Sequence, residues 1–259
     1  MSRSTSMESP PKHSAGGAEP DGARDEKSAA QAVQQMFDQI APRYDLLNHV
    51  LSANIDRWWW WRTARRFRHI LQRPDAKVLD LCCGTGDMAL ALRRASGNSA
   101  SRHYFAADFS HQMLRLSGRK FVGKDIVSIE ADALQLPFRD GSFDLVVSAF
   151  GFRNLANYDA GLREIHRVLK TKGEMGILDF SEPGGVLGKV YGIYFRNVLP
   201  AIGTLISGVK GPYSYLPASV EKFPSPDEML GRMSETGFAD ASWTPYSFGI
   251  AGLYMGRKI

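Results

Sequence analysis

From residue 76 onward, short apolar runs alternate with amphipathic segments, and this alternation constrains the fold more than any other feature of the sequence. The runs have strand length and cover residues 77–82, 103–108, 126–131, 143–148 and 174–180. After the first run, residues 87–95 have the spacing of a helix. After the second run, Ser110 can cap another helix. It recurs in the face formed by Leu162, Ile165, Val168 and Leu169, whose helix should end before Lys172-Gly173. Such alternation predicts a doubly wound α/β domain with a parallel sheet.

The two ends of the chain depart from this alternation. Residues 183–215 are glycine-rich, aromatic and apolar, which predicts an inserted helical segment. A helix at 225–236 precedes two strands at 239–247 and 249–257, so the sheet should end in an antiparallel hairpin. Near the N-terminus, helical spacing begins at Glu26 and ends at Pro42, and a second helical region covers 45–71.

The first 25 residues are rich in Ser, Pro, Gly, Ala and charge, and they offer few apolar side chains for burial. This composition predicts a disordered tail over 1–25. Residues 26–259 have the length of one α/β domain, in which 26–72 should form a helical lid.

A glycine loop, Asp80-Leu-Cys-Cys-Gly-Thr-Gly-Asp87, lies between the first strand and the first helix. Gly84 and Gly86 lack a Cβ atom, so the backbone can turn tightly and approach a ligand at the carboxyl end of the sheet. A pyrophosphate gains nothing from the carboxylate of Asp80 at the start of this loop. An acid there suits a cationic ligand that carries an ammonium or a sulfonium.

Acidic residues also end the next two strands. Asp108 can accept hydrogen bonds from ribose hydroxyls, and Phe109 can lie against an adenine face. Asp132 and Ala133 end the third strand, where they could meet the adenine edge. Each aspartate could instead cap a helix, but their coincidence with the glycine loop favours a nucleoside ligand.

Charge, cysteine content and hydropathy exclude some classes of protein and leave others open. The net charge of +5 suits nucleic acid or membrane head groups without selecting either. The only cysteines, Cys82 and Cys83, are adjacent and fit neither a disulfide framework nor a zinc site, so no metal is expected. With neither a long apolar run nor a signal peptide core, we expect a cytoplasmic protein.

Several motifs resemble those of the quinone-biosynthesis C-methyltransferases, the UbiE/MenG family. They are Met36-Phe-Asp-Gln-Ile-Ala-Pro-Arg-Tyr-Asp-Leu-Leu-Asn48, Val78-Leu-Asp-Leu-Cys-Cys-Gly-Thr-Gly-Asp87, Phe150-Gly-Phe-Arg-Asn154, Ala160-Gly-Leu-Arg-Glu-Ile-His-Arg-Val-Leu-Lys170, Ile177-Leu-Asp-Phe-Ser-Glu-Pro183, Tyr213-Ser-Tyr-Leu-Pro-Ala-Ser219 and Phe223-Pro224. The glycine loop is generic to methyltransferases, whereas the first motif, Phe-Gly-x-Arg-Asn and Tyr-x-Tyr-Leu are specific.

The resemblance implies a Rossmann-like class I methyltransferase sheet and S-adenosyl-L-methionine as cofactor. It implies methyl transfer to a ring carbon of a polyprenyl hydroquinone, namely demethylmenaquinol or, alternatively, a benzoquinol of the ubiquinone pathway. By motif, the cofactor contacts fall on Thr85, Asp108, Asp132 and Ala133. Departures from the family pattern are Ala149 in place of a serine that some members use, Phe152 in place of Leu or Ile, and four consecutive tryptophans in place of one.

Arg153 and Asn154 are the candidate catalytic residues, because they follow the fourth strand. A hydroquinone carbon becomes nucleophilic when the adjacent hydroxyl loses its proton. Arginine is a poor base, so Arg153 would stabilise the phenolate or orient a water that takes the proton, and Asn154 would hold the hydroxyl or that water. The alternative is that Arg153 forms a structural ion pair with a helix acid. Asn48, Tyr213 and Tyr215 are expected in the substrate pocket wall.

Trp58, Trp59, Trp60 and Trp61 cover every side of a helix, so they cannot all point into one core. Arginines follow them at 62, 65, 66 and 68, a composition typical of interfacial helices. We therefore expect peripheral contact with the inner face of the membrane, with core packing and homodimer contacts as alternatives. Two other functions stay open: an RNA methyltransferase, although no nucleic-acid module is visible, and a non-catalytic binding module.

Overall fold

Seven strands form one sheet in the order β3-β2-β1-β4-β5-β7-β6. The computed structural model describes residues 16–18, 20, 23–44, 52, 54–97, 103–181, 183, 192 and 212–259. The strands are β1 (Val78–Leu81), β2 (Tyr104–Asp108), β3 (Ile126–Glu130), β4 (Phe143–Ala149), β5 (Leu169–Phe180), β6 (Phe238–Tyr246) and β7 (Ala251–Lys258). The first five pair in parallel, and β7 is antiparallel to both β5 and β6. The predicted doubly wound sheet with an antiparallel C-terminal hairpin is confirmed.

Helices cover both faces of the sheet because consecutive strand residues point to opposite sides. On one face, Val78 and Leu145 pack with α3 (Ile55–Arg66), α4 (Arg68–Leu71) and α5 (Asp87–Ala95). Next to α5 on this face lies α6 (His111–Phe121), which Ser110 caps by accepting a hydrogen bond from Met113 N at 3.2 Å. On the other face, Leu79 and Val146 pack with α7 (Tyr158–Val168) and α11 (Pro226–Thr236).

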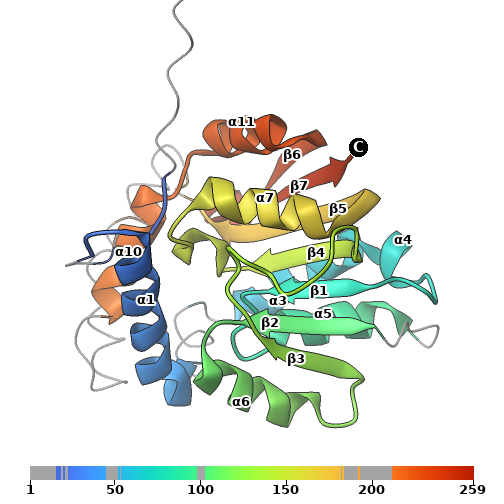
Figure 1. Ribbon diagram of the computed structural model, residues 1–259, viewed down its shortest axis with the longest axis horizontal. Helices are drawn as coiled ribbons and strands as arrows, with labels where there is room; N and C mark the ends of the chain where they lie inside the picture. The colour runs from blue at the N-terminus through green and yellow to red at the C-terminus, as the bar shows by residue number, and fades with distance from the viewer. Residues whose placement is uncertain are drawn as a thin grey trace, which may run out of the picture.

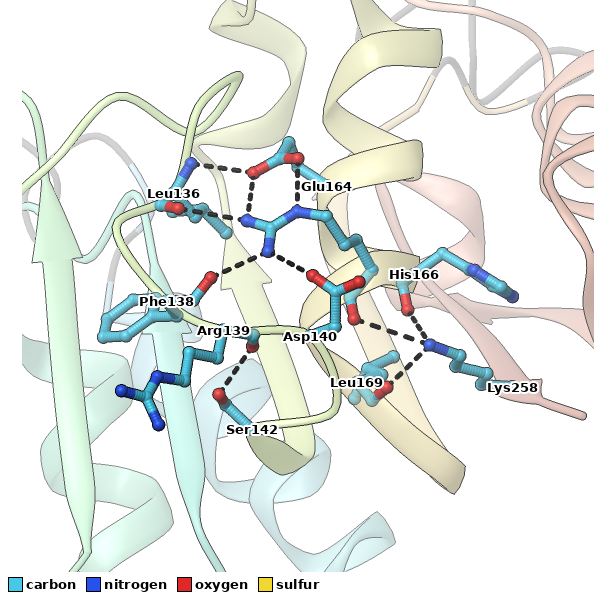
Figure 2. Close-up of polar contacts among 10 residues, drawn as sticks. Leu136, Phe138, Arg139, Asp140, Ser142, Glu164, His166, Leu169 and Lys258 are labelled. Atoms are coloured by element: carbon cyan, nitrogen blue, oxygen red, sulfur yellow. Dashed lines mark hydrogen bonds and ion pairs between the residues drawn. The ribbon is translucent and has the colours of Figure 1, made fainter.

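The helix predicted to include Leu169 ends one residue earlier, so that part of the prediction is wrong. Leu169 is the first residue of β5 and pairs with Phe143. Lys258 lies at this helix end, where its Nζ donates to the His166 carbonyl at 2.7 Å and the Leu169 carbonyl at 2.9 Å (Figure 2). A cation at a helix C-terminus satisfies carbonyl groups that a longer helix would otherwise bond.

Helices from both ends of the chain meet beyond the carboxyl ends of the parallel strands. Figure 1 shows α1 (Glu26–Ile40) and α10 (Pro212–Lys222) together at this edge, and they contact each other. The 3₁₀ helix η1 (Ala41–Arg43) follows α1, where Pro42 was predicted to end it. Of the helical region predicted at 45–71, the structure describes residues 52 and 54–71, which include α3 and α4. Of the insertion predicted at 183–215, it describes residues 183, 192 and 212–215.

The described part of the predicted disordered tail includes a short segment that contacts the fold. Gly16 accepts a backbone hydrogen bond from Tyr158 N at 3.0 Å, and Ala18 N donates to the Leu155 carbonyl at 2.8 Å. A Cβ atom at Gly17 would collide with the carbonyl of Ala156. The chain before α1 therefore lies against the loop that leads into α7.

Candidate active site

A cavity opens at the carboxyl ends of β1, β2 and β4, where the sequence predicts the ligand. The predicted site residues that line it are Asp80, Gly84, Thr85, Asp108, Phe109, Asp132, Ala133 and Asn154. Ala30, Phe37, Tyr44 and Trp60 close it from the N-terminal helices. Gly86, Arg153 and Tyr215 do not line it.

The glycine loop has a backbone shape that only glycine adopts easily. Gly84 and Gly86 have positive φ angles of 53° and 88°. Gly86 also packs against the ring of Phe121, so its contribution is to the shape of the loop. Lys120 stabilises the same loop from α6, because its Nζ lies 3.1 Å from Thr85 Oγ1 and 3.0 Å from an Asp87 carboxylate oxygen.

Replacing Gly86 with Ala is expected to destabilise the protein by about 2–4 kcal/mol, since the new Cβ would collide with the Phe121 ring in a left-handed backbone conformation. Urea unfolding measures the loss. Gly118→Ala is the matched control, because a Cβ there meets nothing within 4 Å. Equal unfolding midpoints for the two variants would contradict the proposed role of Gly86.

Asp80 is a buried carboxylate at the bottom of the cavity. It is 1% exposed, and within the described chain neither carboxylate oxygen has a hydrogen-bond partner. Burial raises the pKa of Asp80 well above its ordinary value, and the nearby Ala89 N–H offsets this only in part. A buried anion without a partner is costly, so this arrangement favours a cationic group in the cavity.

Asp108 is also buried, but the loop around it satisfies part of its hydrogen-bonding capacity. Its Oδ2 accepts from Gly84 N at 2.8 Å, and its Oδ1 accepts from Ser110 N at 2.9 Å. Burial raises the pKa of Asp108 from 3.8 to about 6, although these backbone bonds oppose the shift. Each oxygen keeps a lone pair that can accept from a ligand hydroxyl.

Affinity for S-adenosylmethionine is expected to be about tenfold weaker at pH 5 than at pH 7, because ribose hydroxyls donate best to ionised Asp108.

The stability of the ligand-free protein should change with pH in the opposite direction to the affinity. The folded pKa lies above the unfolded value, so the ligand-free protein loses stability as pH rises from about 4 to about 6. Calorimetric titration checks the affinity. Asp108→Asn should bind weakly with a flatter pH profile, and an unchanged profile would show that another group titrates.

The loop after β3 presents Asp132 and Ala133 to the cavity and is held from behind by α7. Glu164 accepts from Leu136 N at 2.8 Å. Arg167 donates to the carbonyls of Leu136 at 3.0 Å and Phe138 at 2.7 Å, and pairs with Glu164 and Asp140 at 2.8 Å (Figure 2). Sequence reasoning missed this clamp, although Glu164 and Arg167 stand at the spacing of a helical ion pair.

Arg153 lies behind the cavity wall and forms an ion pair with Asp179 of β5, at 2.8 Å between Nη1 and Oδ1. The two residues are 5% and 0% exposed. Nη1 also donates to the Phe150 carbonyl, and Tyr158 Oη donates to the Arg153 carbonyl at 3.0 Å. The structural ion pair that the sequence left open is therefore present, but the expected helix acid is wrong, because the partner is Asp179 of strand β5.

Asn154 reaches the cavity from the turn that Arg153 braces. Its Nδ2 donates to the Phe150 carbonyl at 3.5 Å, and its Oδ1 is buried without a partner in the described chain. Two neighbouring residues thus have different surroundings: Asn154 has an acceptor available to a ligand, whereas Arg153 is committed to Asp179.

The residues predicted for the substrate pocket wall fall elsewhere or cannot be placed. Asn48 and the side chain of Tyr213 lie outside the described residues. Tyr215 is partly buried beside Arg153 and Asp179, and burial raises its pKa to about 12. Phe37, Tyr44 and Trp60 line the cavity but were not predicted to do so, since helical spacing alone makes such residues ordinary core positions.

The described residues hold no group of three or more metal-ligating side chains. Among them there is also no helix long and apolar enough to cross a membrane.

Comparison with known proteins gives matches along most of the chain. The sequence model of the ubiE/COQ5 methyltransferase family matches residues 24–258. The demethylmenaquinone methyltransferase of Deinococcus radiodurans is 45% identical over 238 residues, covering 90% of this chain and 95% of that protein. The enzyme of that name from Thermus thermophilus is 44% identical, covering 86% and 100%. The ubiquinone/menaquinone biosynthesis C-methyltransferase UbiE of Geotalea daltonii is 42% identical, covering 88% and 97%.

Solved structures share the fold at low sequence identity. A SAM-dependent methyltransferase of Thermotoga maritima has a TM-score of 0.57 at 16% identity and covers 88% of this chain and 100% of its own. The cyclase SpnF has a TM-score of 0.64 at 16% identity and covers 88% and 96%. These structures establish the fold, and the cyclase is a reminder that the fold alone does not determine the reaction.

Proposed function

Because the chain belongs to the ubiE/COQ5 methyltransferase family, we propose that it transfers a methyl group from S-adenosylmethionine to a ring carbon of a polyprenyl hydroquinone, in the first place demethylmenaquinol. The observation that carries the proposal is the buried Asp80 carboxylate, which has no partner within the described chain and lines the cavity. Its charge complements the cationic groups of this cofactor.

The residues around the cavity fit S-adenosylmethionine by their chemistry. Asp80 would hold its cationic end, Asp108 its ribose hydroxyls, and Asp132, Ala133 and Phe109 its adenine, with Gly84 and Thr85 forming the loop beside it. When bound, the cofactor supplies an electrophilic methyl group on a sulfonium. Cys82, Ala149 and Phe150 supply apolar wall, so the pocket excludes much of the water that would screen the reacting charges.

We propose a division of labour between the two predicted catalytic residues. Asn154 would accept a hydrogen bond from the substrate hydroxyl at its free Oδ1, which aligns the ring, and the hydroxyl proton would then leave to a water molecule. Arg153 would act as a positioning residue, since it braces the turn through the Phe150 carbonyl and is held by Asp179.

A transfer assay with radiolabelled S-adenosylmethionine tests the substrate directly. Reduced demethylmenaquinone, a reduced benzoquinone precursor and bulk RNA serve as acceptors. We expect label in the naphthoquinol, and label in both quinols would make the enzyme serve two pathways. Label in RNA alone, or in no acceptor despite cofactor binding, would reject the hydroquinone assignment.

We also propose that the enzyme works at a membrane surface, where a polyprenyl substrate lies. The four consecutive tryptophans of α3 point to different sides of the helix, as helical spacing requires. Trp59 is buried against Phe150, Trp60 lines the cavity, and Trp58 and Trp61 are 44% and 51% exposed. Phe248, at the tip of the β6–β7 hairpin, is 87% exposed in a left-handed conformation with φ 60°. Trp59 Nε1 donates to Ser247 at 2.9 Å, which connects this tip to α3.

Replacing Trp58 and Trp61 together with Ser should weaken binding to liposomes by at least about tenfold, because exposed tryptophans contribute apolar area at the lipid interface. Co-sedimentation measures the binding. The matched control replaces two exposed valines with Ser. They are Val122, which follows α6 and is 78% exposed, and Val127 of β3, which is 50% exposed. Equal retention of the two variants would reject docking through α3.

A further inference from the structure

A groove between α3 and α5 carries a concentration of positive charge outside the cavity. It has a volume of about 640 Å³. Four arginines line it: Arg57, Arg65, Arg68 and Arg94. The one carboxylate in its wall, Asp87, is bound by Lys120 at 3.0 Å. The groove therefore presents a local excess of cations.

These four guanidinium groups are available to a ligand. Within the part of the chain that the structure describes, none of them forms an ion pair with a carboxylate. By contrast, Arg73, Arg153, Arg167, Arg232 and Arg257 each have an acidic partner at 2.7–2.9 Å. Guanidinium groups that line one groove without acidic partners are suited to bidentate recognition of a phosphate.

Aromatic side chains distinguish the groove from a site for a small soluble anion. Trp60 and Trp61 form part of its wall, and Arg65 stacks over the Trp61 ring at 4.7 Å. Trp61 is half exposed, so its ring can enter an apolar phase while Arg65 holds a charged group beside it. Tryptophan next to arginine is suited to the boundary between head groups and acyl chains.

We infer that the groove between α3 and α5 binds the phosphate head group of an anionic phospholipid. Trp60 and Asp87 line both this groove and the cofactor cavity, so the head-group site lies one side chain away from the reaction centre. Docking would bring the cavity to the membrane surface. This would help the reaction only if the substrate is the proposed polyprenyl hydroquinone, so this part of the inference rests on the proposed function. Lipid binding itself does not depend on that substrate.

The test is co-sedimentation of the full chain with vesicles of phosphatidylcholine alone or mixed with phosphatidylglycerol. We expect binding to the mixed vesicles that weakens with added salt, since head-group attraction is screened. Arg65→Gln combined with Arg94→Gln should weaken it about 25-fold, at about fivefold per arginine near an anionic surface. Thermal unfolding of the variant confirms folding, because both side chains are exposed.

The matched control is Arg139→Gln combined with Arg163→Gln, which removes the same charge from the side of the sheet that α7 covers. The Arg139 guanidinium lies apart from the Glu164 network in Figure 2. The control should lose less than about twofold, because charges farther than about a Debye length from the surface are screened. Equal losses in the two double variants would reduce the effect to net charge and overturn the head-group site.

Two further arms separate other sources of phosphate. In the first arm, inorganic phosphate is added to the wild type and to the groove variant. If phosphate stabilises only the wild type, and the wild type does not bind vesicles, the groove is a site for soluble anions and the lipid assignment is overturned. RNA binding lost in the groove variant, again without vesicle binding, would overturn it too. Neither arm measures methyl transfer, so a failed substrate assignment and a failed head-group site are distinguishable.

Discussion

Asp80→Asn is expected to weaken S-adenosylmethionine binding by about a hundredfold or more while raising the stability of the ligand-free protein. The wild-type carboxylate is buried without a partner in the described chain, so removing its charge relieves a desolvation cost. The same change removes the anion that faces the cationic cofactor, and charge-assisted hydrogen bonds contribute about 1.5–3 kcal/mol each. Calorimetric titration and thermal unfolding measure the two effects.

Asp144→Asn is the matched control, because Asp144 is also a buried aspartate and lies outside the cavity. Its carboxylate pairs with Arg73 at 2.9 Å and Lys170 at 2.7 Å and accepts from Lys77 N at 2.9 Å. These partners lower the pKa of Asp144 despite its burial. The control should lose stability and keep its cofactor affinity. If Asp80→Asn behaved in the same way, Asp80 would be a structural carboxylate.

Asp179→Ala is expected to lower the free energy of unfolding by about 3–5 kcal/mol, because it leaves the Arg153 guanidinium buried without its counter-charge. Arg153→Ala should cost a similar amount, so a loss of turnover in that single variant would not separate catalysis from folding. Combining Arg153→Met with Asp179→Leu should recover most of the stability, since an apolar pair of similar volume tolerates burial. Urea unfolding measures all three variants.

Turnover of the double variant then decides what the pair does for the reaction. We expect it to bind S-adenosylmethionine normally and to lose most of its kcat, because the turn that presents Asn154 is no longer braced at the Phe150 carbonyl. Asn154→Leu, which is close in size and removes the free Oδ1, should lose kcat with little loss of stability, because the only side-chain hydrogen bond removed within the described chain is the long one to the Phe150 carbonyl at 3.5 Å. A double variant with wild-type kcat would reduce the Arg153–Asp179 pair to a structural role.

The sequence predicted the sheet and the cofactor end of the site because both depend on local pattern. Apolar runs of strand length alternating with helices leave few topologies, and parallel pairing brings the carboxyl ends of the strands to one edge. Asp80, Asp108 and Asp132, each within two residues of the end of a strand, therefore had to meet, and all three line one cavity. Because these strands run parallel, their carboxyl ends lie together even though they are distant in the sequence.

The tertiary structure decided the roles of side chains whose surroundings come from other elements. Arg153 and Asn154 are adjacent polar residues, yet only packing against β5 commits Arg153 to Asp179 and leaves Asn154 facing the cavity. Helical spacing required the four tryptophans to point in different directions, but contacts with Phe150 and with the β6–β7 hairpin determined which ones are buried. The arginine groove likewise exists only because α3 lies against α5. Local pattern sets where a side chain can point, whereas the energy of a buried charge depends on what the fold places beside it.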